Sequence, residues 1–121
     1  MRTGIAIFAH GSAVESANDA VRRVVDEFAR SGGFDMVECS FLELGQPDLP
    51  AAVVKLVERG AERIVVAPYF LTSGKHLKRD LPRIVEEIRA ARPGLEISVT
   101  PPMDGHPGLA SILVDRVRSA L

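Results

Sequence analysis

Three histidines occupy positions where an imidazole has no evident structural duty. His10, His76 and His106 each follow a short run that favours a β-strand, and none lies within a periodic apolar segment. In an open α/β sheet the loops beyond the carboxyl ends of parallel strands meet at one edge, where ligands bind. Neutral imidazole is a common ligand of divalent transition metals. The three positions therefore predict a ligand site at one edge of a sheet.

The triplet His10-Gly11-Ser12 ends the first predicted strand. Glycine permits a sharp turn, and the Ser12 hydroxyl can cap the helix that follows. Those two duties leave the histidine unexplained, so we expect His10 to be a functional residue.

The second histidine lies in a basic segment. His76 is flanked by Lys75, Lys78 and Arg79, close to the start of a predicted helix. Positive charge near a helix N-terminus is unfavourable for the helix dipole. A solvated loop is the simpler interpretation, but this unfavourable placement indicates an anionic ligand.

Three further residues could contribute chemistry. Glu43 ends the second predicted strand between two leucines, and it fits either a base or metal ligand or an exposed strand-end glutamate. His106 precedes Pro107 in a turn, where it fits a surface residue, a supporting partner or a ligand. Cys39, in mid-strand, fits a small buried hydrophobe.

Short apolar runs alternate with longer amphipathic ones. Strands are predicted over 4–9, 36–42, 63–68 and 96–100, and helices over 14–30 and from the cap Asp48 to Glu58. Asp80 is predicted to cap a third helix that ends before Pro93, with a start near His76 as the weaker alternative. A fourth helix opens at Pro107 and carries an apolar side that consists of Leu109, Ile112, Leu113, Val117 and Leu121.

This alternation predicts one α/β domain over residues 1–121. The expected architecture is a flavodoxin-like three-layer sandwich, in which a parallel sheet of order 2-1-3-4 has helices on both faces. The order reverses between the first and third strands, which His10 and His76 follow. We therefore expect the two imidazoles to share a pocket.

The composition excludes several other classes. The formal net charge is −1, which does not favour nucleic-acid binding. No apolar run approaches the ~18 residues of a membrane span. A single cysteine excludes an intramolecular disulfide and a cysteine-rich metal site, and the dinucleotide and P-loop glycine motifs are missing. We expect a cytoplasmic protein.

Four blocks of the sequence resemble the class II tetrapyrrole chelatases. They are His10-Gly11-Ser12 with Ala17-Asn18, the segment from Phe41 to Pro50, the segment from Val66 to Leu71, and the segment from Gly74 to Pro82. The sequence is most similar to the single-domain sirohydrochlorin chelatases of the CbiX/SirB type. The blocks occur in the family's order and span nearly the whole chain. One departure is Ala13, where family members often carry a basic residue.

The resemblance implies insertion of Co²⁺, Fe²⁺ or Ni²⁺ into sirohydrochlorin, without an organic cofactor, in cobalamin or siroheme biosynthesis. It also implies a homodimer. His10 and His76 match the paired metal-binding histidines, and Glu43 matches an acid near the site. Ser12, Ser73, Lys75, Lys78, Arg79 and His106 are then the candidates that contact the substrate's carboxylates.

Two other functions remain open from the sequence. The same histidines would suit a carrier that holds and transfers a divalent metal, or a tetrapyrrole-binding module without catalysis. A metal carrier has no need of the basic residues near His76, so this segment favours the chelatase.

Overall fold

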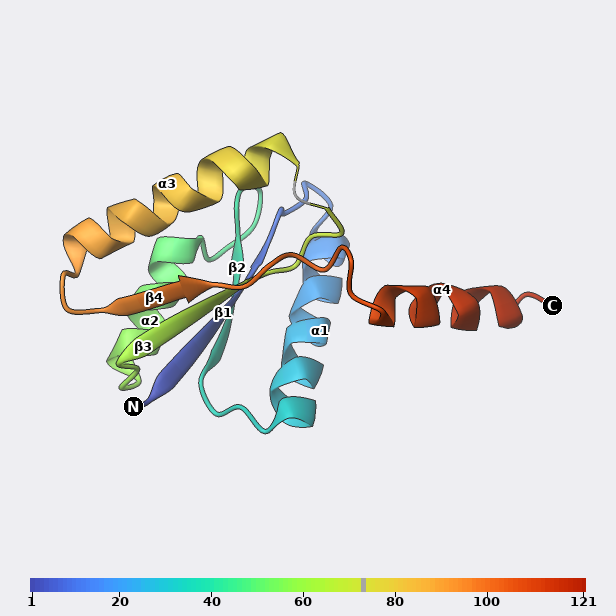
Figure 1. Cartoon of the computed structure of the whole chain (residues 1–121), viewed down its shortest axis with the longest axis horizontal. Helices are drawn as coiled ribbons and strands as arrows, with labels where there is room; N and C mark the ends of the chain where they lie inside the picture. The colour runs from blue at the N-terminus through green and yellow to red at the C-terminus, as the bar shows by residue number, and fades with distance from the viewer. Residues whose placement is uncertain (73) are drawn as a thin grey trace.

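The computed structural model describes residues 1–72 and 74–121, and of His76 it describes the backbone alone. Within these residues strands and helices alternate along the chain (Figure 1). The elements are β1 (Thr3–Ala9), α1 (Glu15–Gly32), β2 (Val37–Phe41), α2 (Leu49–Glu58), β3 (Arg63–Pro68), α3 (Lys75–Ala91), β4 (Glu96–Val99) and α4 (Gly108–Arg118). No helix in the described part of the chain has the length and apolar character needed to cross a membrane.

The strands form one parallel sheet of order β2-β1-β3-β4, which confirms the predicted order. β1 lies in the middle of the sheet, and six of its seven residues are buried. This burial on both faces explains why its sequence is an almost unbroken apolar run. The order reverses beside β1, so the carboxyl ends of β1 and β3 lie next to each other. We call this edge of the sheet, where the ligand site is expected, the site edge.

Helices cover the two faces of the sheet unequally. α2 and α3 pack together over one face and enclose the larger core, which includes Phe8, Leu56 and Val85. α1 covers part of the other face, where Val25 packs against Ile5 and Ile7 of β1. The predicted three-layer arrangement is therefore present (Figure 1).

Helix ends follow local capping chemistry, with one correction. Asp48 caps α2 as predicted, because its carboxylate accepts a hydrogen bond of 2.9 Å from the Ala51 N–H. Ser12, however, does not cap α1. The N-cap is Val14, and the Ser12 hydroxyl instead accepts a bond of 3.0 Å from the Val14 N–H within the preceding turn.

The predicted start of the third helix at Asp80 is wrong, and the weaker alternative, a start near His76, is confirmed. α3 begins at Lys75, with Gly74 as its N-cap, so Asp80 and Pro82 lie inside the helix. Leu77 and Leu81 are buried in the core one turn apart, and their burial stabilises the early turns despite the missing N–H of Pro82. The side chain of Asp80 pairs with Arg79 and Arg83 instead of capping.

The fourth helix forms where the sequence predicts it, but it does not pack on the sheet. α4 projects away from the rest of the molecule, on the side toward which β4 runs (Figure 1). None of its residues is buried, and Ile112, Leu113 and Val117 of its apolar side are each more than half exposed. The amphipathic pattern therefore identified the helix without identifying what covers it.

Candidate functional site

Backbone hydrogen bonds bring His10 and Glu43 together at the site edge. Beyond the last residues of β1 and β2, the Leu42 N–H donates to the Ala9 carbonyl at 2.8 Å, and the Glu43 N–H donates to the His10 carbonyl at 3.1 Å. Main-chain hydrogen bonding between the two segments thus continues just beyond the ends of the two strands. His10 and Glu43 are held as neighbours by the main chain itself.

Gly11 allows this close approach. Its φ is +92°, and a Cβ at this position would lie 1.7 Å from the carbonyl oxygen of Glu43. Any larger residue would force the two loops apart. The glycine of the His10-Gly11-Ser12 triplet therefore brings the first loop (10–14, between β1 and α1) against the second loop (42–48, between β2 and α2).

The hydrogen bonding of His10 fixes its tautomer. Nδ1–H donates to the Gly11 carbonyl at 3.0 Å, because a carbonyl oxygen can only accept. In the neutral ring Nε2 then carries the lone pair, and it lies 3.4 Å from Oε1 of Glu43. Two electron-pair donors that face each other at this distance are stabilised by a proton or a cation. The side chains are 48% and 56% exposed, so a ligand can reach both.

The Phe70 ring packs against the His10 ring. The two rings meet edge to face, with centroids 6.3 Å apart, and Phe70 in turn contacts the buried Phe8 of β1. The Tyr69 N–H donates to the Phe8 carbonyl at 2.7 Å, which fixes the chain that leaves β3 beside β1. Phe70 is therefore a positioning residue that the sequence analysis did not identify.

Asn18 joins the two loops of the site, and the sequence analysis did not assign it a role either. Its side chain is buried; it accepts a bond of 2.9 Å from the Ser12 N–H and donates to the Ser12 and Leu44 carbonyls at 2.9 and 3.0 Å. The signal in the sequence is a polar residue in line with Val21 and Val25 on the apolar side of α1.

Arg22 holds the second loop from the same helix. Its guanidinium lies over the Phe41 ring at 5.2 Å and donates to the Gln46 carbonyl at 3.0 Å. It also binds Glu15, and this hydrogen bond holds the pKa of the Glu15 carboxyl below its usual range. Between these anchors Leu44 adopts a left-handed conformation with φ of 57°, an uncommon geometry for leucine.

The basic residues lie on the first turns of α3, which starts from the site edge. Lys75, Lys78 and Arg79 are exposed, and Arg79 donates to Asp80 at 3.1 Å. In the described part of the chain no ion pair involves Lys75 or Lys78. The side chain of His76 and the whole of Ser73 lie outside the described residues, so the expected pairing of His10 with His76 stays a prediction.

The third histidine and the cysteine have local surroundings. Nδ1 of His106 accepts a bond of 2.9 Å from the Gly108 N–H at the start of α4, and the residue is exposed. Substrate binding by His106 stays a prediction. Cys39 is half-buried next to the core under α1, and burial raises the pKa of its thiol. It therefore behaves as the small hydrophobe that we expected.

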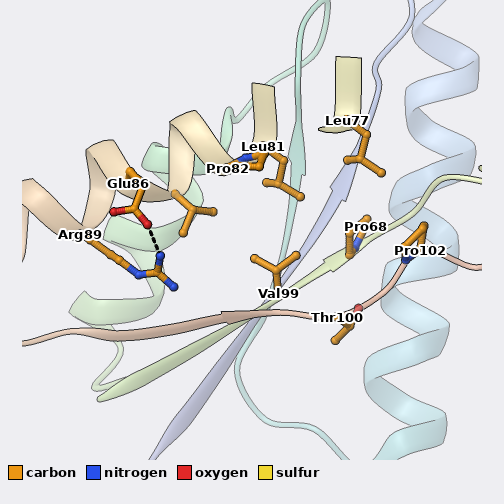
Figure 2. A pocket seen from close by; sticks show the side chains of 10 residues that line it. Pro68, Leu77, Leu81, Pro82, Glu86, Arg89, Val99, Thr100 and Pro102 are labelled. Carbon is orange, nitrogen blue, oxygen red and sulfur yellow. Dashed lines mark hydrogen bonds and ion pairs between the residues drawn. The ribbon is translucent and has the colours of Figure 1, made fainter. Parts of the chain in front are cut away.

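A hollow of about 310 Å³ opens beside the site, between α3 and β4 (Figure 2). Pro68, Leu77, Leu81, Val85 and Val99 form much of its apolar wall. At one end Glu86 and Arg89 form an ion pair with each other (Figure 2). The hollow thus offers apolar contact area and little polar chemistry of its own.

The site edge as described combines one imidazole, one carboxylate and a basic helix start. Among the residues with described side chains, no three histidine, cysteine, aspartate or glutamate groups converge on one point. His10 and Glu43 are therefore the pair from which a metal-binding proposal must be built.

Comparison with known proteins adds a family. The sequence model of the CbiX family matches residues 4–120. The chain is 31% identical over 118 residues to the chloroplastic sirohydrochlorin ferrochelatase of Arabidopsis thaliana, covering 98% of this chain and 52% of the plant protein. It is 32% identical over 118 residues to a sirohydrochlorin cobaltochelatase of Sulfurisphaera tokodaii, covering 98% of this chain and 93% of the archaeal protein.

Two solved structures have the same fold. A protein from Marinobacter aquaeolei, described as a CbiX protein of cobalamin biosynthesis, superposes with a TM-score of 0.86 at 26% identity, over 98% of this chain and 96% of its own. The sirohydrochlorin chelatase SirB of Bacillus subtilis subspecies spizizenii, in complex with cobalt, superposes with a TM-score of 0.81 at 28% identity. This match covers 85% of the present chain and 44% of SirB, so the chain spans about half of the plant and SirB proteins.

Proposed function

Because this chain belongs to the CbiX family, we propose that it is a sirohydrochlorin chelatase, which inserts Co²⁺, Fe²⁺ or Ni²⁺ into sirohydrochlorin. The observation that carries the proposal is the match of nearly the whole chain to proteins named sirohydrochlorin ferrochelatase and cobaltochelatase. The metal ion is a substrate of this reaction, and no organic cofactor takes part.

His10 is the proposed metal ligand of the described site. Its Nδ1–H bond to the Gly11 carbonyl leaves Nε2 as the basic nitrogen of a side chain that is about half exposed. Imidazole nitrogen suits all three ions and can replace water in their coordination shells. His76 is proposed as the second ligand, on the resemblance stated above.

Glu43 is proposed to act on protons. Metal insertion breaks two pyrrole N–H bonds, and the two protons leave as the ion forms its bonds to nitrogen. A carboxylate that is more than half exposed and 3.4 Å from the metal ligand can accept one proton and release it to water. The same negative charge stabilises the cation before transfer.

The start of α3 is proposed to bind the substrate's rim. Sirohydrochlorin carries many carboxylates, and Lys75, Lys78 and Arg79 offer positive charge on exposed turns at the site edge. The orphan N–H groups of the helix start add hydrogen-bond donors. Ser12 can supply a hydroxyl from the first loop, and Ser73 and His106 complete the proposed set.

Single-domain operation, a homodimer and a cytoplasmic location belong to the same proposal. A Marinobacter protein of nearly the same length has this fold, which supports one chelatase domain over residues 1–121. The homodimer supplies the second half that longer relatives such as SirB carry in one chain. The cobalamin pathway is proposed from the description of the Marinobacter protein, and the siroheme pathway is the alternative that iron insertion would imply.

The test is an absorption-monitored insertion assay. Purified protein is mixed with sirohydrochlorin and Co²⁺, Fe²⁺ or Ni²⁺, and we expect the spectrum of the metal complex to grow faster than in the protein-free control. A protein that binds the metal or the macrocycle tightly without accelerating insertion would instead be a carrier or a binding module.

A further inference from the structure

Three large apolar side chains lie uncovered at the site edge. Among the described residues from β1 to β4, only Val14, Leu44 and Leu71 are large apolar residues that are more than half exposed, at 61%, 60% and 65%. Val14 ends the first loop, Leu44 lies in the second, and Leu71 lies between β3 and α3. These three loops lie at the same end of the sheet (Figure 1). Single exposed apolar residues are ordinary, whereas three that share one edge form a contact surface.

Hydrogen bonds tie two of these residues together. The buried side chain of Asn18 donates to the Leu44 carbonyl at 3.0 Å and accepts from the Ser12 N–H at 2.9 Å. The Ser12 hydroxyl in turn accepts a bond of 3.0 Å from the Val14 N–H. The positions of Val14 and Leu44 are therefore fixed relative to each other before any ligand binds.

The polar pair of the site lies among these apolar residues. Leu44 directly follows Glu43, and Leu71 directly follows Phe70, whose ring packs against the His10 imidazole. A ligand that reaches Nε2 of His10 therefore meets apolar side chains from the neighbouring loops. This arrangement suits a molecule with an apolar face and metal-binding nitrogens at its centre.

Leucine is an unfavourable residue for the local backbone at position 44. Its φ of 57° lies in the left-handed region, where the Cβ crowds the following carbonyl and glycine or asparagine fits better. The core does not need this side chain, since 60% of the residue is exposed. A strained backbone that presents an exposed side chain is typical of a functional position.

Val14 has the same character at the start of α1. It is the N-cap of the helix, but its side chain makes no capping hydrogen bond. Serine, threonine, aspartate and asparagine stabilise this position, whereas valine does not. Val14 and Leu44 are therefore both exposed apolar residues at places where asparagine would suit the backbone better.

We propose that Val14, Leu44 and Leu71 form an apolar seat that binds one face of the substrate macrocycle. The inference rests on the proposed function and adds to it the residues that bind the ring itself. Sirohydrochlorin has charged carboxylates at its rim, which the basic residues of α3 can bind, and a flat unsaturated ring that water solvates poorly. Burial of this ring against the apolar seat is favourable. The seat holds the ring nitrogens close to Nε2 of His10, where the metal ion binds.

The experiment measures binding of metal-free sirohydrochlorin by absorption titration, together with the melting temperature of each variant. In Leu44→Asn and Val14→Asn the Kd should rise about tenfold each, the size expected for one lost apolar contact. Their melting temperatures should equal or exceed that of wild type, because asparagine suits both backbone positions. Leu44→Met should keep the wild-type Kd. Val24→Asn, which removes an exposed apolar side chain midway along α1, is the matched control and should keep it too.

Salt separates the apolar seat from the basic residues. A higher ionic strength screens charge contacts at the rim of the macrocycle but not apolar contact with its ring. The ratio of Kd between Leu44→Asn and wild type should therefore stay the same at high salt, whereas the corresponding ratio for Lys78→Ala should decrease.

Each other outcome overturns a defined part. A wild-type chain that does not bind sirohydrochlorin overturns the proposed function and the apolar seat with it. A wild-type chain that binds it and inserts cobalt, while Leu44→Asn and Val14→Asn bind equally well, overturns the seat alone. Melting temperatures that fall by several degrees in both variants would show that these side chains stabilise the fold instead. A change of mass by light scattering in these variants would show that the side chains contact another copy, which also overturns the seat.

Discussion

Nε2 of His10 lies 3.4 Å from Oε1 of Glu43, and two main-chain hydrogen bonds beyond the ends of β1 and β2 hold the two residues side by side. The imidazole can bind a cation only through this nitrogen, because Nδ1–H is engaged with the Gly11 carbonyl. The Glu43 carboxylate therefore lies close enough to neutralise the positive charge of a cation that binds to Nε2 of His10. This pair is the chemical centre of the described site.

Replacing Glu43 by glutamine should test the negative charge of the side chain without changing its size. Glu43→Gln keeps the size of the side chain but offers an N–H or a neutral oxygen to His10. The cation therefore loses a stabilising negative charge, and the leaving protons lose their acceptor. We expect the rate of cobalt insertion to fall about a hundredfold, a typical loss for a general base. Glu96→Gln, an exposed acid at the opposite end of the sheet, is the control and should keep the wild-type rate. An unchanged rate in Glu43→Gln would remove the carboxylate from the mechanism.

The close approach of the first and second loops can be tested by adding a single Cβ atom at Gly11. In Gly11→Ala the added Cβ would overlap the Glu43 carbonyl oxygen and the backbone φ of +92° would be strained. We expect lower thermal stability and loss of most insertion activity, since both loops must move. Gly94→Ala is the matched control, because its Cβ meets open space. Equal melting temperatures and equal rates for the two variants would contradict the loop geometry.

Asn18→Ala should destabilise the fold and displace the first loop. The substitution leaves the part-buried Ser12 N–H and the Leu44 carbonyl without their partner, and a buried polar group left unpaired costs about 1–3 kcal/mol, so we expect a loss toward the lower end of that range. Urea unfolding measures the loss, with the exposed Asp26→Ala on the same helix as the control. A free energy of unfolding within about 0.5 kcal/mol of wild type, the usual range for surface substitutions, would show that Asn18 does not hold the loops.

The basic residues in the first turns of α3 should affect the binding of the macrocycle more than the binding of the metal. In Lys75→Ala and Lys78→Ala we expect KM for sirohydrochlorin to rise roughly tenfold, about 1.4 kcal/mol for a lost charge-assisted contact, while kcat changes little. Arg92→Ala, at the far end of α3, is the control. Added salt should raise the wild-type KM more than that of the lysine variants. A KM that neither substitution nor salt alters would place the substrate's carboxylates elsewhere.

The sequence predicted the sheet well because its signals are local. β1 and β3 are apolar runs bounded by turn residues, and burial on both faces requires that pattern. The start of α3 was misplaced since Asp80 and Pro82 look like a cap and a first turn. What outweighs them is the burial of Leu77 and Leu81, a tertiary effect.

The candidate site was predictable only in part, for a similar reason. His10 and Glu43 are identifiable because chemistry-bearing residues at strand ends meet at one edge. Asn18 and Phe70 act by holding other residues, and nothing in their own sequence position reports on the partners that they contact. The exposed apolar side of α4 was predicted from its helical spacing, but that spacing does not show what covers it.

Metal insertion by histidine variants is the most direct test of the proposed chemistry. His10→Ala and His76→Ala are compared with wild type in the absorption-monitored assay with Co²⁺, and Glu96→Gln, at the opposite end of the sheet, serves as the control. We predict that the two histidine variants lose most of the insertion rate while their melting temperatures stay close to wild type, and that Glu96→Gln retains the wild-type rate. Wild-type rates in His10→Ala would contradict the account.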